Sequence, residues 1–495
     1  MADFIKINPL DNVVIALKNF SEGETIAVDG QELKVVNDVP KGHKIALVSI
    51  AENEDIIKYG APIGHATQII SAGEHIHVQN IKTNLSGTVN YSFDQKLNEI
   101  THGKRDLTFE GYKRGNGKVG IRNELWIVPT VGCVNGQAQQ IVDLFKSEVG
   151  TENVDAIEVF KHSYGCSQLG DDHTNTQKAL ADVINHPNAG GVFVLGLGCE
   201  NNQIDHLKKF IGDYDESRVR FLAAQDVEDE IEAGLEIMKE IYEVMRKDKR
   251  EAVPLSELNI GLKCGGSDGF SGITANPLVG VFSDFLVAQG GTTILTEVPE
   301  MFGAETLLME RAINKDVFDK TVSLINDFKD YYLQHNLPVY ENPSPGNKKG
   351  GISTLEDKSL GCTQKGGVAT VVDVLRYAEP IRKKGLNLLS APGNDLVAAS
   401  ALGFSGCQMV LFTTGRGTPF GSFVPTMKIS TNSDLFNKKK NWIDFNAGTL
   451  LEGKTMEDLL EEFVQFIIEV ASGKQLNHEK SGFKEIAIFK TGVTL

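Results

Sequence analysis

The stretch ELWIVPTVGCVNGQ, residues 124–137, decides the fold class of this chain. A run of apolar residues ends there at a glycine and a cysteine, and a helical pattern follows. Three later stretches repeat the arrangement: HSYGCSQLG (162–170), VFVLGLGCENN (192–202) and LNIGLKCGGSDG (258–269). Strands that alternate with helices in this way predict parallel βαβ units with helices on both faces of each sheet. The expected strands cover residues 125–131, 156–160, 192–197, 219–223, 258–262, 292–296, 386–389 and 409–413.

The cysteines in these stretches follow their strands. Cys133, Cys166 and Cys199 recur at equal intervals close to the roughly 30 residues of one βα unit, and Cys264 repeats the arrangement. The carboxyl ends of parallel strands share one edge of a sheet, where ligands bind. We therefore expect the four thiols to converge there, provided that their strands are neighbours.

Converging thiolates predict a site for a soft or borderline metal such as iron or zinc. Cys133, Cys166 and Cys199 are the expected ligands, together with His162, which lies four residues before Cys166. The alternative is that each Gly-Cys pair fills a tight turn and has no chemical role. Cys407 precedes its strand and is expected to be structural, and the role of Cys362 stays open.

Changes in pattern along the chain predict four segments. Residues 1–82 contain short β-like runs separated by turn signals, and residues 83–108 are polar and lack apolar periodicity, as in a linker. Residues 109–250 form a second, α/β domain that ends in a long amphipathic helix over residues 227–246. Residues 251–495 form a C-terminal α/β domain, in which Thr455 caps a helix with an apolar stripe.

The segment GEHIHVQN places His75 and His77 two residues apart, so that on a strand both side chains project from the same face. That spacing suits a metal or an anion. The alternative is a pair of solvated histidines at a sheet edge.

Several glycine-rich loops predict a binding site for an anion. TTGRGTPFG follows an expected strand, and Arg416 in it can hold a carboxylate together with backbone N–H groups. Other loops of this kind contribute Lys348, Lys358, Lys365 and Asp395 for a hydroxylated acid. A dinucleotide site is not favoured, because GLGCEN lacks the third glycine of the fingerprint and the later acidic residue that a ribose contact requires.

The composition is that of a globular protein with two or three domains: 495 residues, 41% of them hydrophobic, with a formal net charge of −17. The negative charge argues against nucleic acid and anionic membranes as partners. No apolar run is long enough for a membrane span, and no leader-like pattern opens the sequence. Six cysteines are too few for a disulfide scaffold. We expect a cytoplasmic protein with free thiols.

Long motifs along nearly the whole chain resemble the altronate and galactarate dehydratase family. They are IKYGAPIGHA, GEHIHVQN, GNGKVGIRNELWIVPTVGCVNG, HSYGCSQLGDDH, GLGCENNQ, CGGSDGFSGITANP, TEVPEMFGAE, YENPSPGNKKGGISTLEDKSLGCTQK, LLSAPGND, TTGRGTPFG and AIFKTGVTL. The resemblance implies a multidomain protein, in which a small N-terminal all-β domain of the SAF-type β-clip kind precedes α/β domains with mainly parallel sheets. It also implies a dependence on Fe²⁺ or Mn²⁺, with an iron-sulfur cluster left open.

The activity implied is a carbon-oxygen lyase reaction that removes water from D-altronate, giving 2-dehydro-3-deoxy-D-gluconate, in D-galacturonate catabolism. A base takes the C2 proton and an acid protonates the leaving hydroxyl, so His162 or Lys365 is expected as base and His75 or His77 as acid. Arg416, Lys358 and Asp395 are expected to bind the substrate, with Arg416 on its C1 carboxylate. Galactarate dehydration, sulfolactate cleavage and a noncatalytic sugar-acid sensor are the alternatives, and a homodimer is expected.

Overall fold

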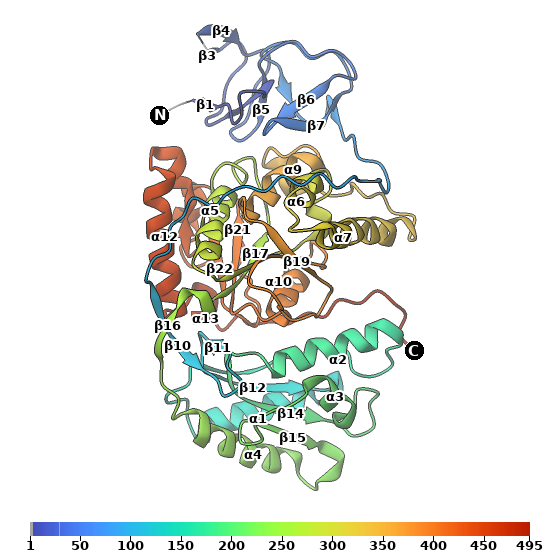
Figure 1. The fold of residues 1–495 in the computed structure, drawn as a ribbon, viewed down its shortest axis with the longest axis vertical. Coiled ribbons are helices and arrows are strands. Elements are labelled where there is room, and N and C mark those ends of the chain that lie inside the picture. Colours follow the sequence, from blue (N-terminus) through green and yellow to red (C-terminus); the bar gives the residue numbers. More distant parts are fainter. Residues whose placement is uncertain (1–2, 29) are drawn as a thin grey trace.

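Nine short strands form the N-terminal domain in the computed structural model, which describes residues 3–28 and 30–495 (Figure 1). They are β1 (Phe4–Ile5), β2 (Val13–Ala16), β3 (Thr25–Val28), β4 (Gln31–Lys34), β5 (Lys44–Ala46), β6 (Asp55–Lys58), β7 (Ala61–Ala66), β8 (His75–Ile76) and β9 (Ile81–Lys82). They pair antiparallel in the orders β1-β2-β5-β8, β3-β4 and β6-β7-β9. All four residues of β2 are buried, so even this small domain has its own apolar core.

Residues 83–107 contain no helix or strand and run along the C-terminal domain to the second domain (Figure 1). This segment contacts the C-terminal domain through apolar side chains such as Leu85 and Ile100 and through hydrogen bonds. The Tyr91 hydroxyl donates to Glu305 at 2.5 Å, and the Lys96 ammonium lies 2.7 Å from a Glu310 carboxylate oxygen. The segment is therefore attached to the surface of the C-terminal domain without adding a layer to it.

The second domain is built on a parallel sheet of order β13-β12-β14-β15. Its elements are β12 (Glu124–Pro129), α1 (Asn135–Glu148), β13 (Ala156–Val159), α2 (Gly170–Ile184), β14 (Ala189–Gly196), α3 (Ile204–Ile211), β15 (Val219–Ala223) and α4 (Glu230–Met245). Alternate residues of β12 face opposite layers, since Leu125 packs with α1 and α4 while Trp126 packs with α2 and α3. The strand is therefore apolar from Leu125 to Pro129.

A three-stranded antiparallel sheet, β11-β10-β16, links the second and C-terminal domains. It consists of β10 (Thr108–Lys113), β11 (Val119–Gly120) and β16 (Glu251–Pro254). β10 precedes the second domain and β16 follows it. Their pairing therefore brings the two ends of that domain together. Phe109 and Val253 from this sheet enter the core of the C-terminal domain.

The C-terminal domain has a seven-stranded parallel sheet of order β19-β20-β18-β17-β21-β22-β23. Its strands are β17 (Asn259–Cys264), β18 (Thr292–Leu295), β19 (Val371–Leu375), β20 (Gly385–Leu389), β21 (Met409–Thr414), β22 (Thr426–Ser430) and β23 (Phe445–Asn446). After β17 the chain adds β18 beside it, then β19 at the edge and β20 between β19 and β18, and it then crosses to the other side of β17 with β21. Such a switch point opens a crevice at the carboxyl ends of the strands, where ligands bind in open α/β sheets.

Helices cover both faces of this sheet (Figure 1). They are α5 (Ala275–Ala288), α6 (Glu305–Met309), α7 (Lys315–Leu333), α8 (Pro345–Lys349), α9 (Leu355–Cys362), α10 (Asp395–Phe404), α11 (Ser433–Lys438), α12 (Met456–Ala471) and α13 (Asn477–Lys480). Thr455 caps α12, accepting a hydrogen bond from the Asp458 N–H, and Phe463 and Ile467 on its inner face are buried, as the sequence predicts. No helix among the described residues is long and apolar enough to cross a membrane.

The expected fold class is confirmed, but the expectation that four thiols share one edge is wrong. Cys133, Cys166 and Cys199 follow β12, β13 and β14, which are neighbours in one sheet. Cys264 instead ends β17 in the other sheet. The local pattern repeats in both domains, whereas membership of a sheet depends on which strands pair.

The N-terminal domain docks on α9 through a buried ion-pair cluster. Asp357 of α9 accepts from Lys44 and from Lys58 of the N-terminal domain, each at 2.8 Å, and all three side chains are almost fully buried. Burial alone would raise the pKa of Asp357, but the two ammonium groups outweigh that and lower it. Burial lowers the pKa of Lys44 to about 8, against the attraction of Asp357.

We expect Asp357→Ala to lower the free energy of unfolding by about 3–5 kcal/mol, because it leaves two ammonium groups buried without their partner. Asp434→Ala is the matched control. Asp434 accepts from Lys41 of the same N-terminal domain, also at 2.8 Å, but with its side chain 81% exposed. It should therefore change stability by less than about 0.5 kcal/mol. Urea denaturation measures the free energy of unfolding of both variants. Equal decreases would contradict a special role of the buried ion-pair cluster in docking the N-terminal domain.

Candidate active site

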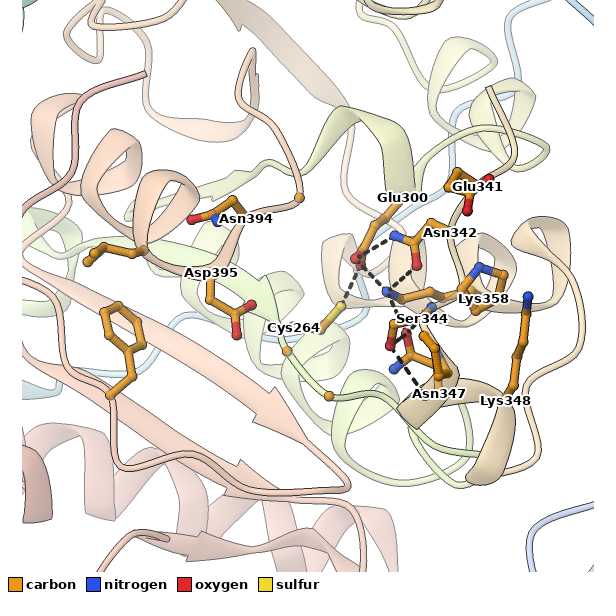
Figure 2. A pocket seen from close by; sticks show the side chains of 17 residues that line it. Cys264, Glu300, Glu341, Asn342, Ser344, Asn347, Lys348, Lys358, Asn394 and Asp395 are labelled. Atoms are coloured by element: carbon orange, nitrogen blue, oxygen red, sulfur yellow. Dashed lines mark hydrogen bonds and ion pairs between the residues drawn. The ribbon is translucent and has the colours of Figure 1, made fainter. Parts of the chain in front are cut away.

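A pocket of about 750 Å³ opens at the carboxyl ends of the strands of the C-terminal domain, beside β17 (Figure 2). Loops after β17 and β20 form one wall, and the segment around α8 together with α9 forms the other. The lining residues are Cys264, Gly265, Gly266, Glu300, Glu341, Asn342, Pro343, Ser344, Pro345, Asn347, Lys348, Lys358, Gly393, Asn394, Asp395, Leu396 and Phe420. The pocket therefore lies at the switch point of the sheet, where the topology predicts a ligand site.

Two thiols and a carboxylate meet at the base of this pocket. The Cys264 Sγ lies 2.7 Å from Glu300 Oε2 and 3.2 Å from the Cys362 Sγ, which in turn lies 3.3 Å from Glu300 Oε2. All three side chains are buried. Among the described residues, this is the one group of three Cys, His, Asp or Glu ligand atoms that lie within 4.8 Å of one another. Thiolate and carboxylate donors together suit a borderline divalent ion such as Fe²⁺.

Lysines surround this group. Lys358 lies 2.7 Å from Glu300 Oε1 and also contacts the side-chain oxygen of Asn342 at 3.1 Å (Figure 2). Burial would raise the pKa of Glu300, but the charges of Lys358, Lys365 and Lys263 outweigh it and lower the pKa to about 2. The contact with Cys362, burial and the charge of Glu300 raise the pKa of Cys264. Without a metal Cys264 therefore stays a thiol, and a bound cation would have to displace its proton.

Asp395 faces these groups from the other side of the pocket (Figure 2). It is the first residue of α10, its side chain is 45% exposed, and its carboxylate is held at 2.8 Å by the buried ammonium of Lys263. Lys263 also donates to Glu297 at 2.6 Å. The backbone at Glu297 adopts a left-handed conformation with φ of 69°, which is strained for a residue with a side chain and is typical of functional sites.

The structure brings some of the predicted site residues to the pocket and places others elsewhere. Lys358 and Asp395 line it, and Lys365 lies just beneath it, 4.0 Å from Glu297 Oε2. Burial would lower the pKa of Lys365, but the acidic groups around it, Cys264, Cys362, Glu297 and Glu300, raise it, so its amine is protonated at neutral pH. Arg416 is exposed and is not among the lining residues, although its side chain packs beside Gly266, which is.

His162 and the three equally spaced cysteines belong to the second domain. The backbone engages both ring nitrogens of His162, because Nε2 contacts the Pro129 carbonyl at 2.8 Å and Nδ1 accepts from the Tyr164 N–H at 3.1 Å. Cys133, Cys166 and Cys199 are exposed at the edge of their own sheet. As placed, their sulfur atoms do not form a three-ligand group within 4.8 Å. They remain a predicted metal site, without His162 as an available ligand.

His75 and His77 do project to one side of the N-terminal domain, as their spacing predicts, and a third histidine joins them. His43 Nδ1 lies 3.0 Å from His75 Nε2, and the centroids of the His43 and His77 rings are 4.8 Å apart. Burial, followed by nearby positive charge, lowers the pKa of His75 to about 4 and that of His77 to about 3. None of the three lines the pocket. A role for His75 or His77 as the catalytic acid therefore has no support from the geometry.

The sequence reasoning missed the carboxylates of the site, Glu297 and Glu300. A signal was available, because TEVPE, residues 296–300, follows an expected strand and places two acidic residues three apart in an otherwise apolar stretch. The reasoning also left Cys362 without a role. Because Cys362 lies in a helix and does not follow a strand, its sequence pattern did not indicate that it contacts Cys264.

A polar pocket with lysines, a carboxylate and buried thiols at the switch point of a parallel sheet defines an α/β enzyme acting on a small anionic molecule. Comparison with known families identifies the domains in order. They match the altronate/galactarate dehydratase SAF domain (residues 2–84), the second domain of D-galactarate dehydratase/altronate hydrolase (111–246) and the C-terminal domain of D-galactarate/altronate dehydratase (255–494). The chain belongs to the altronate/galactarate dehydratase family and is a lyase.

Relatives of known activity cover the chain from end to end. An altronate dehydratase of Bacillus subtilis is 61% identical over 100% of both chains, and one of Escherichia coli is 57% identical over 99% of this chain and 100% of its own. A galactarate dehydratase (L-threo-forming) of Escherichia coli is 35% identical over 96% of this chain and 94% of its own. The resemblance that the sequence motifs predict is thereby confirmed.

Proposed function

We propose that this chain removes water from D-altronate to give 2-dehydro-3-deoxy-D-gluconate. The observation that carries the proposal is the identity of 57–61% over the full chain with two altronate dehydratases, against 35% with a galactarate dehydratase. The pocket adds chemical support. It contains lysines that can bind one carboxylate, an aspartate that can act as a base, and two cysteines and a glutamate that can bind a metal.

The ion that we propose is Fe²⁺, with Mn²⁺ as an alternative, held by Cys264, Cys362 and Glu300. The donor set fits, since the three ligand atoms face one another in a buried site that three lysines keep near electrical balance. When bound there, such an ion would act as a Lewis acid toward the substrate oxygens.

Asp395 is the side chain that we assign as the general base. Its carboxylate is partly exposed in the pocket, and Lys263 holds it in one orientation. It takes the proton from C2, and the electrons of that bond form the C2–C3 double bond while the C3–O bond breaks. Lys358 stabilises the negative charge that builds on the C1 carboxylate during this step. The geometry favours Asp395 over Lys365, whose raised pKa keeps it protonated.

The departing hydroxide takes up a proton and leaves as water. Lys348 is our choice for the donor, because it is half-buried among the lining residues and takes part in no salt bridge among those described. The enol that results becomes the 2-keto product without a redox cofactor. Every proton and electron pair is thereby accounted for.

Removal of metal should abolish the activity. We expect dialysis against a chelator to lower turnover to background, and Fe²⁺ together with a thiol reductant to restore it, because thiolate ligands must stay reduced and deprotonated to bind. Keto-acid formation from D-altronate measures both steps. Full turnover by protein with no measurable metal would exclude a metal-dependent mechanism.

The pocket predicts a preference for one carboxylate. Both lining cations, Lys348 and Lys358, lie on the α8 and α9 side, whereas the lining residues opposite include Asp395 and Asn394 but no cation (Figure 2). A second carboxylate at the far end, as in galactarate, would be desolvated beside a negative charge. We expect kcat/KM for D-altronate to exceed that for galactarate by at least about a hundredfold, roughly 2.7 kcal/mol.

Steady-state kinetics with both acids tests this proposal directly. Comparable values for the two acids would favour galactarate dehydration as an equal activity, and binding of D-altronate without turnover in the metal-loaded protein would favour a sensor. Arg416→Lys tests the predicted role of Arg416 in the same assay. Unchanged kinetics in that variant would leave Lys358 and Lys348 as the carboxylate partners.

A further inference from the structure

Three histidines cluster where the N-terminal domain meets α8. His43 lies next to β5, whereas His75 begins β8 and His77 follows it, and β5 and β8 are paired strands. The centroids of their rings lie 4.8–5.8 Å apart. His43 is buried and the other two are half-buried. The proposed mechanism uses none of these three imidazoles.

The hydrogen bonds of His43 direct a lone pair into this histidine cluster. Its Nε2 lies 3.4 Å from the Lys349 carbonyl, an acceptor only, so Nε2 carries the ring proton. Nδ1 then holds a lone pair, which accepts a hydrogen bond from the His75 Nε2–H at 3.0 Å, and an ion bound between the two nitrogens would replace that proton. A backbone carbonyl that fixes the tautomer of a histidine, with the other nitrogen as an acceptor, is the usual support of a metal-ligating histidine.

The third ring provides an independent observation. His77 Nδ1 is buried and has no hydrogen-bond partner in the part of the chain that the structure describes. A buried polar atom without a partner costs about 1–3 kcal/mol, so its persistence in a cluster of like side chains calls for a ligand. Two nitrogens about 3 Å apart also match the spacing of neighbouring ligands around an ion bound at about 2.0–2.1 Å. As placed, the three imidazoles do not each bring a nitrogen within 4.8 Å of the others, so a turn of the rings has to accompany binding of an ion.

We propose that His43, His75 and His77 form a second metal site, distinct from the thiol and carboxylate group of the pocket, for a borderline divalent ion such as Zn²⁺ or Co²⁺. Imidazole nitrogens prefer ions of this class to Mg²⁺ or Ca²⁺. The site supplies three protein ligands and leaves a position for water.

The location of the site indicates what the ion would do. The Lys349 carbonyl that orients His43 belongs to the last residue of α8, and Asn347 and Lys348 of the same helix line the pocket. An ion on the three histidines would tie β5 and β8 of the N-terminal domain together and fix His43 against α8. It would thus stabilise the wall of the pocket from outside, without contact with the substrate.

Titration of the chelated full-length protein with Co²⁺ separates the two sites. A site made only of imidazoles gives visible ligand-field bands without the strong near-ultraviolet absorption of a thiolate bound to cobalt. We expect Cys264→Ala/Cys362→Ala to lose the thiolate absorption of the pocket but to keep the equivalent bound by the histidines. His77→Gln should lose about one equivalent and keep the thiolate absorption. His65→Gln, which changes a half-buried histidine of the same domain outside the cluster, should bind as much Co²⁺ as the unmodified protein.

Equal numbers of bound Co²⁺ ions in His77→Gln and in the unmodified protein would overturn the proposal. A second measurement uses no histidine variant, so its result does not depend on whether His77→Gln folds. In Cys264→Ala/Cys362→Ala loaded with Zn²⁺, X-ray absorption should show nitrogen and oxygen neighbours at about 2.0–2.1 Å with the outer-shell pattern of imidazole. Absence of bound zinc, or a shell without imidazole, would equally overturn it. Neither readout depends on catalysis, so failure of the proposed function leaves this test intact.

Discussion

Cys362→Ala should lower kcat/KM for D-altronate at least about a thousandfold, roughly 4 kcal/mol, because it removes one ligand of the proposed catalytic ion. The sulfur of Cys362 lies 3.2 Å from that of Cys264 and 3.3 Å from Glu300 Oε2. With an alanine there, two protein ligands remain. We expect bound iron to fall together with turnover, as measured by metal analysis and keto-acid formation on the same samples.

Cys407→Ala is the matched control for that substitution. Both cysteines are buried, with 3% and 0% of their surface exposed, but Cys407 precedes β21 at the opposite edge of the sheet. Its loss should cost some stability through a small cavity and leave metal content and rate near those of the unmodified protein. If both variants keep the full rate, the thiols of the pocket are structural. If Cys362→Ala loses its metal but keeps its rate, the ion is not required for the reaction.

Asp395→Asn should lower kcat by about 10²–10⁴-fold, the usual contribution of a general base, with a smaller change in KM. Asparagine keeps an oxygen that can accept from Lys263, so the orientation of the residue is preserved while its basicity is lost. Release of deuterium from C2-deuterated D-altronate into solvent, which follows cleavage of the C2–H bond, should stop in this variant. Bound metal should stay unchanged, which distinguishes a lost base from a damaged metal site.

Asp434→Asn serves as the control for the loss of a carboxylate, because Asp434 is exposed on α11 and pairs only with Lys41 among the described residues. Its kinetics should match those of the unmodified protein. An Asp395→Asn enzyme that cleaves the C2–H bond at the full rate would exclude Asp395 as the base. Lys348, another titratable side chain on the lining, would then be the candidate to examine.

The sequence predicted those parts of the fold that depend on local patterns. Apolar runs of the length of buried strands, alternating with amphipathic helices, predict α/β domains with parallel sheets, because the periodicity of each segment reflects its own burial. Thr455 predicts the start of α12 for the same reason, since a cap acts within three residues. The long motifs also sufficed to identify the family. The glycine-rich loops predicted Arg416, Lys358 and Asp395 as substrate-binding residues, and the last two line the pocket.

Only the tertiary structure decided which of these local units meet. Four strands that are each followed by a cysteine have the same sequence pattern. However, β17 pairs in a different sheet from β12, β13 and β14, so Cys264 lies apart from the other three thiols. Its partner Cys362 is 98 residues away along the chain, and Asp357 meets Lys44 across 313 residues. Contacts of this kind depend on the packing of whole domains, and no periodicity of 2 or 3.6 residues encodes them. The sequence therefore determined the elements and the family, while the packing of the domains decided the site.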